Sequence, residues 1–316
     1  MQLRTEIPLS KEHHLIDYDS KLVLLGSCFS ENIGKKLSYF KFKNIVNPFG
    51  ILFHPIAIEN SILNIINEKQ FTEKDIFFHN ELWHSFETHS ILNSSSKEGF
   101  LASINNVVKL ANTQLNNASH IVITLGTAWI YRFIETDTIV ANCHKIPQKR
   151  FSKELLKVNE ITESLEASIA LLRNLQKDVP IIFTVSPIRH LKNGFMENQL
   201  SKAHLLSAIH EVVDPKEQVY YFPSYEIMMD ELRDYRFYAE DMIHPSNTAI
   251  QYIWEKFRDT WISDETINLM EDVNSIQKNL AHKPFNPKSK QYQEFLKGTE
   301  EKIRNLQIKI PDINFK

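Results

Sequence analysis

Four short apolar runs, separated by long stretches with helical periodicity, constrain the fold of this 316-residue chain most strongly. The runs cover residues 21–25, 120–125, 180–185 and 218–222. Each has the length of a buried strand, and the stretches between them are long enough for crossover helices. Buried strands that are joined through helices form a parallel sheet covered on both faces. We therefore predict an α/β fold.

Apolar residues repeat at helical spacing in the connecting stretches. This spacing predicts helices over residues 29–40, 55–66, 99–115, 153–176, 198–212, 225–232 and 246–257. Ser246 is a suitable cap for the last of these helices. Residues 82–89 alternate like a half-exposed strand, and residues 129–133 and 138–141 predict a strand pair.

Two segments interrupt the alternation of strands and helices, and we expect both to be insertions. They lie around residues 67–118 and 141–151. The end of the chain is helical in character but contains the proline-bearing stretch Lys283–Lys288. We predict one main domain over residues 1–262 and a helical C-terminal extension over residues 263–316.

Composition excludes several classes of protein. The net charge is −3, and no basic surplus points to a nucleic-acid partner. No apolar run approaches the length of a membrane span, and residues 1–17 do not resemble a signal peptide. The chain contains only two cysteines, Cys28 and Cys143, which fits a reducing compartment better than a disulfide scaffold. These features predict a cytoplasmic protein; the oligomeric state cannot be read from the sequence.

Polar residues gather where three of the predicted strands end. Gly26-Ser27-Cys28 follows the first strand, Gly126-Thr127-Ala128 the second, and Ser186–His190 the third. Ligands of open α/β sheets bind outside the carboxyl ends of the strands, so these residues are predicted to form one site. Arg189 is the cation best placed to meet an anionic group of a ligand.

Cys28 and Ser27 are two candidate nucleophiles at the start of a predicted helix. Helix N-terminal amides and the helix dipole stabilise a thiolate and lower its pKa, which favours Cys28 as the reactive residue. Cys28 is equally compatible with a small buried hydrophobic residue. Ser27 is the rival nucleophile, although serine at this position is commonly a helix cap.

Asp241 and His244 form a candidate pair of orienting carboxylate and general base. A carboxylate three residues before a histidine can reach its nearer ring nitrogen within a turn. That contact fixes the tautomer and stabilises the imidazolium formed during proton transfer.

Other polar residues have simpler interpretations. Three histidines recur every five residues, at His79, His84 and His89, and this spacing does not place them on one helix face. No zinc motif matches the sequence. We therefore predict no metal and no cofactor. Lys202 is expected to be solvated or ion-paired. Asn142-Cys143-His144-Lys145 is either a structural loop or a segment that folds over the strand ends and contacts substrate.

The motif Gly26-Ser27-Cys28-Phe29-Ser30, together with Asp241-x-x-His244-Pro245-Ser246, resembles the GSCFA-domain proteins, which look like the SGNH (GDSL-type) hydrolases. The resemblance covers roughly residues 3–260 and includes these further segments: Asn47–Gly50 with His54-Pro55, Thr124–Trp129, Asn142–Lys145, Ser186–His190 and Arg233–Tyr238. It implies a flavodoxin-like, SGNH-type three-layer α/β/α sandwich.

The resemblance also implies roles for individual residues. SGNH hydrolases include esterases, thioesterases and carbohydrate deacetylases, and their serine nucleophile falls on Cys28. Their second glycine, a backbone donor to the oxyanion, falls on Gly50, and their final Asp-x-x-His falls on Asp241 and His244. Their third block falls on Gly126 to Trp129.

One departure from the SGNH pattern affects the oxyanion site. The asparagine side chain that donates to the oxyanion is replaced by Ala128, which cannot donate. Losing one such donor typically lowers the rate ~10²–10³-fold. Asn142 or His144 is a candidate replacement.

The sequence therefore predicts a hydrolase that acts on an ester or thioester, including glycan esters, by acyl transfer through Cys28 or Ser27. His244 serves as base and Asp241 orients it, while Gly50, Gly126, Thr127, Asn142, His144 and Arg189 are the predicted oxyanion and substrate residues. Two alternatives use the same scaffold: a non-catalytic module that binds a glycan or acyl ligand, and an acyltransferase.

Overall fold

A five-stranded parallel sheet forms the centre of the molecule. The computed structural model describes residues 5–315. The strands are β1 (Lys21–Gly26), β2 (Lys43–Val46), β5 (His120–Leu125), β9 (Ile181–Val185) and β10 (Val219–Tyr221). Their spatial order is β10-β9-β5-β1-β2, and every neighbouring pair is parallel. In sequence order this is 2-1-3-4-5, the flavodoxin-like order, whose switch point lies between β1 and β5.

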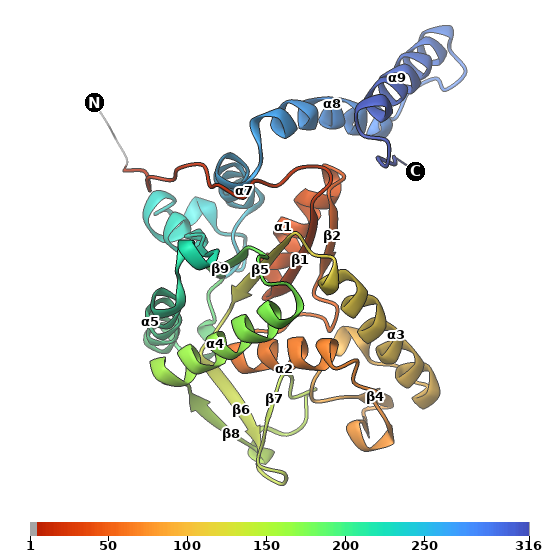
Figure 1. The fold of residues 1–316 in the computed structure, drawn as a ribbon. Coiled ribbons are helices and arrows are strands. Elements are labelled where there is room, and N and C mark those ends of the chain that lie inside the picture. Colours follow the sequence, from red (N-terminus) through yellow and green to blue (C-terminus); the bar gives the residue numbers. More distant parts are fainter. Residues whose placement is uncertain (1–4, 316) are drawn as a thin grey trace.

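Helices cover both faces of the sheet, which confirms the predicted three-layer α/β/α fold (Figure 1). The first face carries α2 (Pro55–Ile66), α3 (Lys97–Asn116), α4 (Val158–Leu175) and α5 (Phe195–Val212). The second carries α1 (Cys28–Tyr39), the π-helical turn Ile227–Glu231 that follows the short α6 (Ser224–Glu226), and α7 (Asn247–Trp261).

Side chains of the central strands alternate between two cores. In β1, Val23 and Leu25 pack with α2 and α3, whereas Leu22 and Leu24 pack with α1 and α7. Both sets are almost fully buried. A strand that is apolar on both faces reads as a continuous apolar run, which is why the sequence predicts β1 correctly.

The edge strand β2 has no such signal, and the sequence analysis missed it. Only Ile45 and Val46 are apolar in its four residues, and all four are half-buried. An edge strand pairs on one side and needs no continuous apolar run.

A smaller antiparallel sheet continues directly from the carboxyl end of β5. It consists of β6 (Trp129–Phe133), β7 (Thr138–Val140) and β8 (Phe151–Leu155) in the order β7-β6-β8. Figure 1 places it at the end of the molecule opposite to the C-terminal helices. The predicted pair of strands is confirmed, but the predicted helix over residues 153–176 is wrong in its first turn.

Cross-strand pairing explains this difference. Arg132 on β6 bonds Glu154 on β8 at 3.0 Å, and Trp129 lies opposite Leu155. These contacts hold Lys153 to Leu155 in extended form, so α4 begins only at Val158. Tertiary pairing therefore overrides the local helical pattern.

The segment that follows α2, predicted to be an insertion, contains a β-hairpin and a long helix. It contains the hairpin β3 (Phe77–His79) and β4 (Leu82–His84), so only the first part of the predicted strand 82–89 is extended. The helix α3 that ends the segment belongs to the main core, where it buries five side chains: Phe100, Ile104, Val108, Ala111 and Leu115.

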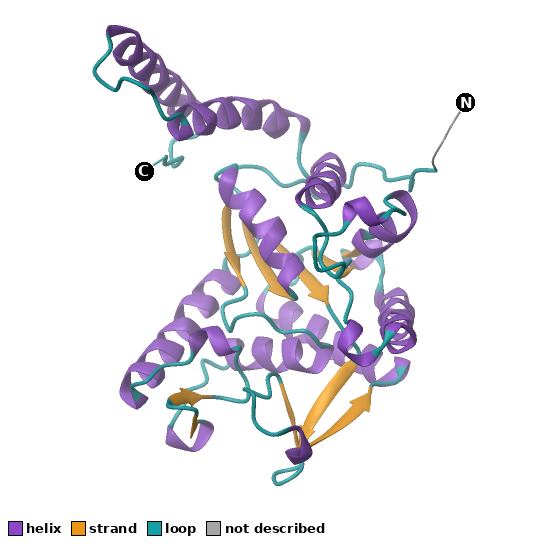
Figure 2. Cartoon of the chain, turned by 180° about the vertical axis from the view of Figure 1, so that it is seen from behind, coloured by secondary structure: helices purple, strands orange, loops and turns teal. Residues whose placement is uncertain are grey.

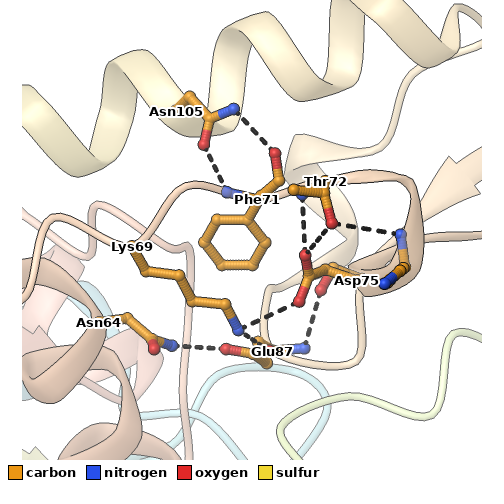
Figure 3. A network of polar contacts seen from close by, with 9 residues as sticks. Asn64, Lys69, Phe71, Thr72, Asp75, Glu87 and Asn105 are labelled. Carbon is orange, nitrogen blue, oxygen red and sulfur yellow. Dashed lines mark hydrogen bonds and ion pairs between the residues drawn. The ribbon is translucent and has the colours of Figure 1, made fainter.

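A polar network ties this segment to α2 and α3 (Figure 3). Lys69 pairs with Glu87 at 2.5 Å and with Asp75 at 3.4 Å. The Asn105 side chain on α3 both accepts from and donates to the Phe71 backbone. These bonds fix the hairpin against the rest of the layer.

The C-terminal helices α8 (Asp264–Ala281) and α9 (Lys290–Lys309) form a hairpin at the amino edge of the sheet. Lys43, the first residue of β2, pairs with Asp312 at 2.9 Å. Figure 2 shows the central strands pointing away from these helices. The domain boundary at residue 262 stays a prediction. None of the helices within residues 5–315 combines the length and apolar content that crossing a bilayer requires.

Candidate active site

Cys28 occupies the first position of α1, directly after the turn that ends β1. Gly26 closes this strand with φ +122°, and its N–H donates to the Asn47 side chain at 2.8 Å. A Cβ on Gly26 would lie 2.0 Å from the Thr124 carbonyl oxygen of β5. Only glycine fits this turn, which delivers Cys28 to the carboxyl edge of the sheet.

The pKa of the Cys28 thiol is raised, chiefly by burial. The N–H groups of Cys28 and Phe29 and the charge of Lys202 lower this pKa, while the Glu31 carboxylate raises it further. The prediction that the helix N-terminus lowers the pKa of the Cys28 thiol overall is therefore wrong. Desolvation of the thiolate outweighs the amides that face it.

Ser27 is the cap of α1. Its Oγ accepts from the Phe29 N–H at 3.2 Å, and the residue is completely buried. A Cβ built on Gly126 would approach the Ser27 Cβ to 3.4 Å, so the second strand end packs directly on this cap. The structural interpretation of Ser27 as a cap is confirmed, and Cys28, which is partly exposed, is the better candidate nucleophile.

Asp241 and His244 form a hydrogen-bonded pair in the loop before α7. Asp241 Oδ2 lies 2.6 Å from His244 Nδ1, and Oδ1 accepts from the N–H groups of Ile243 and His244 at 2.9 Å each. These three bonds lower the pKa of Asp241 to about 2, and the bond from the His244 N–H has the largest effect. An ionised carboxylate accepts from Nδ1–H, so the lone pair of His244 lies on Nε2, as a general base requires.

Backbone bonds fix the loop that carries this pair. Met242 adopts a left-handed conformation with φ +58°. The Ala239 N–H donates to the His244 carbonyl at 2.7 Å, and the Arg189 N–H donates to the Ile243 carbonyl at 3.2 Å. The second bond joins the histidine loop to the segment that follows β9.

The backbone N–H groups of three predicted oxyanion or substrate residues donate within the fold. The Gly50 N–H donates to the Asn47 carbonyl at 2.7 Å. The N–H groups of Gly126 and Thr127 both donate to the Phe53 carbonyl, at 2.8 and 3.0 Å. These glycines and Thr127 therefore shape the strand ends, and the expected role of the Gly50 amide as an oxyanion donor is corrected.

Helix α5 supplies polar side chains that the sequence analysis did not assign to the site. Ser201 Oγ accepts from the Ala128 N–H at 2.7 Å, and Asn198 Oδ1 accepts from the His190 N–H at 2.9 Å. Lys202 lies beside Ser201 on the same buried face. The sequence does contain a signal for these residues: they are polar at positions where the helical repeat predicts apolar, buried side chains.

Lys202 is the buried cation of the site. It is 1% exposed, and its Nζ donates to the carbonyl oxygens of Gly126 at 2.8 Å and Ser186 at 2.6 Å. Within residues 5–315 the hydrogen-bond acceptors of its Nζ are these two carbonyl oxygens and no carboxylate. Burial lowers the pKa of Lys202 to about 7. The expectation of a solvated or ion-paired lysine is therefore wrong.

His190 lies between Lys202 and the histidine loop. Burial, the Lys202 charge and the His244 charge together lower its pKa to about 3, so the ring is neutral near neutral pH. Its Nε2 is buried and has no hydrogen-bond partner among the described residues. The Lys202 charge therefore acts on both His190 and Cys28, whereas the His244 charge acts on His190.

A cavity of about 330 Å³ is lined by His190, whereas Cys28 and His244 are not among its lining residues. Its lining combines the strand ends, represented by Thr127 and His190, with Asn142 and Cys143 of the insertion. Aromatic side chains, among them Trp129, make up much of the remaining wall. The segment after β7 therefore reaches the strand ends, and Asn142 lines the cavity.

His144 has a structural role instead. It is 3% exposed; its Nε2 lies 2.7 Å from the Ser85 carbonyl oxygen and its Nδ1 lies 3.0 Å from Ser90 Oγ. Burial lowers its pKa to about 4. Both ring nitrogens therefore bond within the fold and hold the segment after β7, and a substrate contact of His144 stays a prediction.

Arg189 faces a different, smaller cavity of about 210 Å³. Its guanidinium stacks on Tyr238, 4.0 Å from the ring centre. It thus supports the histidine loop rather than lining the larger cavity. Among residues 5–315 no group of three or more histidine, cysteine or acidic side chains is arranged to hold a metal ion.

Comparisons with known proteins give one clear match. The model of a family described as "GSCFA family" matches residues 21–257, and one described as "GSCFA domain protein, C-terminal domain" matches residues 273–316. No curated protein matches the chain.

Two solved structures resemble it weakly. One is an acetyl esterase mutant with acetate ion, at 10% identity, and the other a carbohydrate esterase family 3 protein from Talaromyces cellulolyticus, at 9%. Both have a TM-score of 0.37 and cover 80% of this chain and 99% of their own. Likeness at this level carries no argument about function.

Proposed function

The chain belongs to the GSCFA family, and we propose that it hydrolyses an ester or thioester by acyl transfer through Cys28. The observation that carries this proposal is the Asp241–His244 pair, whose bond at 2.6 Å prepares His244 Nε2 as a base. The bond from the Arg189 N–H to the Ile243 carbonyl, which joins the loop of this pair to the segment after β9, supports placing the pair at the carboxyl edge with Cys28.

The first half of the reaction forms an acyl-enzyme. His244 Nε2 takes the proton of the Cys28 thiol, and the sulfur attacks the carbonyl carbon of the substrate. The carbon–oxygen or carbon–sulfur bond to the leaving group breaks, and the leaving group receives the proton from His244. An acyl thioester on Cys28 remains. Asp241 stabilises the imidazolium while it carries the proton.

The second half releases the acid. His244 takes a proton from water, and the hydroxide attacks the thioester carbonyl. The bond to sulfur breaks, the carboxylic acid leaves and the proton returns to Cys28. The Cys28 N–H, which has no acceptor within the first turn of α1, supports the oxyanion in both halves. The Asn142 side chain at the cavity wall is the second proposed donor.

Turnover of a panel of acetyl esters and acetyl thioesters by matched variants tests this proposal. We expect Cys28→Ala and His244→Gln each to abolish turnover, because nucleophile and base act as one unit. Ser27→Ala loses only the cap of α1 and should retain turnover at reduced stability. Unchanged turnover in Cys28→Ala would reject Cys28, and loss confined to Ser27→Ala would assign the reaction to Ser27.

A second candidate function has a specific observation in its favour. The pKa of Cys28 is raised, and the amides of Gly50, Gly126 and Thr127 donate within the fold. These features favour a module that binds a glycan or acyl ligand without turnover. Calorimetric titration with the non-hydrolysed amide analogues of the ester panel distinguishes the two: a binding module binds them and turns over no ester.

A further inference from the structure

The cavity of about 210 Å³ that Arg189 faces is formed by two parts of the chain that the proposed mechanism leaves without a task. One is the segment after β9, which contributes Arg189. The other runs from the π-helical turn into the stretch Arg233–Tyr238. One water molecule needs about 10–15 Å³ of such space, so the cavity has room for a group of several heavy atoms.

Two tyrosine rings hold the Arg189 guanidinium at the wall of this cavity. Its central carbon lies 4.0 Å from the ring centre of Tyr238 and 5.5 Å from that of Tyr235. Stacking on a ring covers the flat face of a guanidinium and leaves the N–H groups at its edge free to donate. Arg189 is therefore oriented in advance for an oxyanion, which can accept two parallel bonds from this edge.

The charges around the cavity favour an anion as its occupant. In the part of the chain that the structure describes, Arg189 forms no ion pair with a carboxylate. Arg233 pairs with Asp230 at 3.8 Å, and both side chains are exposed. Asp234 also lines the cavity, but it already accepts from the Arg236 side chain at 3.0 Å and from its N–H at 2.9 Å. The positive charge of Arg189 therefore attracts an anion and repels a cation.

Backbone contacts attach the walls of this cavity to the histidine loop. The Arg189 N–H donates to the Ile243 carbonyl at 3.2 Å, and Tyr238 forms an antiparallel bridge with Pro245. Ile243 and Pro245 are the two neighbours of His244 in the chain. An anion in the cavity therefore binds to the same framework that carries the proposed base.

We propose that this cavity is a binding subsite for the carboxylate or phosphate group of a small ligand. The Arg189 guanidinium donates two bonds to the anion, and Arg233 adds a second positive charge at the rim. The apolar part of the wall, which includes Met228 and Leu232, contacts the atoms next to the anionic group. The inference is independent of the proposed function, because it requires neither Cys28 nor a proton transfer.

NMR titration of the ¹⁵N-labelled protein with succinate and with inorganic phosphate tests this proposal. Sodium chloride keeps the ionic strength constant, so that general screening does not change. We expect saturable shifts of the Arg189 Nε–H and Tyr235 N–H signals, with a dissociation constant of the order of millimolar. Arg189→Met should weaken binding by at least about tenfold. Tighter binding of succinate identifies a carboxylate ligand, and tighter binding of phosphate identifies a phosphate ligand.

Arg304→Met is the matched control, because Arg304 is exposed on α9 at the amino edge of the sheet. This variant should bind both anions as the wild type does. Unchanged affinity in Arg189→Met would overturn the proposal. Wild-type shifts that do not saturate, or that spread over exposed lysines and arginines, would overturn it as well.

Arg233→Gln provides a second measurement if Arg189→Met does not fold, because Arg233 is exposed. It removes the charge at the rim and should weaken binding about two- to fivefold. Affinity equal to that of the wild type would then overturn the proposal.

Cys28→Ala separates this proposal from the proposed function. The variant should bind both anions with wild-type affinity, even where it no longer turns over an ester. Loss of anion binding in Cys28→Ala would place the anion at the sulfur and overturn the subsite. Retained turnover in Cys28→Ala would reject the proposed nucleophile and leave the Arg189 subsite intact.

Discussion

At the scale of single residues, the bond between Asp241 and His244 decides whether the site can move a proton. One carboxylate bonds the ring nitrogen and two backbone N–H groups, so it sets the orientation of the imidazole and the conformation of the turn at once. Asparagine at position 241 would offer an N–H to the ring and favour the wrong tautomer. We predict that Asp241→Asn lowers turnover by about 10³–10⁴-fold with little effect on KM, measured with the best ester of the panel.

The lowered pKa of Asp241 also predicts how the free energy of unfolding of Asp241→Asn differs from that of the wild type as the pH changes. The carboxyl titrates at about 2 in the folded protein, against an ordinary value of 3.8. Its contribution to stability is therefore complete above about pH 4 and is lost as the pH falls through 2. In urea unfolding, the stability difference between wild type and Asp241→Asn should shrink between those values. A difference that stays constant would show that the carboxylate does not stabilise the loop.

Gly26 is the residue on which the position of Cys28 depends. A side chain there would collide with backbone at 2.0 Å and would be strained at φ +122°. We predict that Gly26→Ala destabilises the protein by at least about 3 kcal/mol, or prevents folding, in urea unfolding followed by circular dichroism. Gly298→Ala is the control: Gly298 lies within α9 with open space around it, and alanine should stabilise by about 0.5–1 kcal/mol.

At the scale of elements, α5 is the helix that holds the strand ends in place. Ser201 satisfies the buried N–H of Ala128, and removing its hydroxyl leaves that group without a partner. We predict that Ser201→Ala costs about 1–3 kcal/mol of stability in urea unfolding. Ser207→Ala, on the exposed side of the same helix, should cost close to nothing. Equal effects of the two variants would contradict the role of α5.

The elements that the sequence predicts well are those whose signal is local. Helix α2 and strand β5 have the predicted bounds, and Ser246 caps α7 through the Ala249 N–H as expected. Each of these is encoded by an apolar repeat or by a cap that acts within one turn. The Asp241–His244 bond is equally local, since it spans three residues.

The features that the sequence analysis missed depend on residues far apart in the chain. Strand β8 is extended because it pairs with β6, and β2 is extended because it pairs with β1. The use of the Gly50 and Gly126 amides, and the burial of Lys202, follow from how three strand ends and α5 meet. No local pattern carries that information, so the motifs predicted the position of Cys28 at the start of α1 but not its electrostatic surroundings.

At the scale of the whole molecule, the sheet separates the proposed chemistry from the C-terminal helices. The candidate site lies at the carboxyl edge, and α8 and α9 lie at the amino edge (Figures 1 and 2). Leu306 on α9 is 2% exposed and belongs to the core shared with α1 and α8.

Substitutions in α9 test this separation. We predict that Leu306→Ala lowers stability by about 2–5 kcal/mol, measured by urea unfolding, and leaves the pH profile of Cys28 alkylation unchanged below the transition. Ile308→Ala, at a position that is 80% exposed in the same helix, should change neither property. A shifted Cys28 profile in Leu306→Ala would show that the two edges are coupled.

The most direct test of the central claim is to trap the acyl-enzyme. Wild-type protein and His244→Gln are exposed briefly to an activated acetyl ester, quenched in acid and analysed by intact mass and peptide mapping. The account predicts one acetyl group on Cys28 in the wild type and a much smaller amount in His244→Gln. An acetyl group on any other residue, or equal acetylation of Cys28 in both proteins, would contradict it.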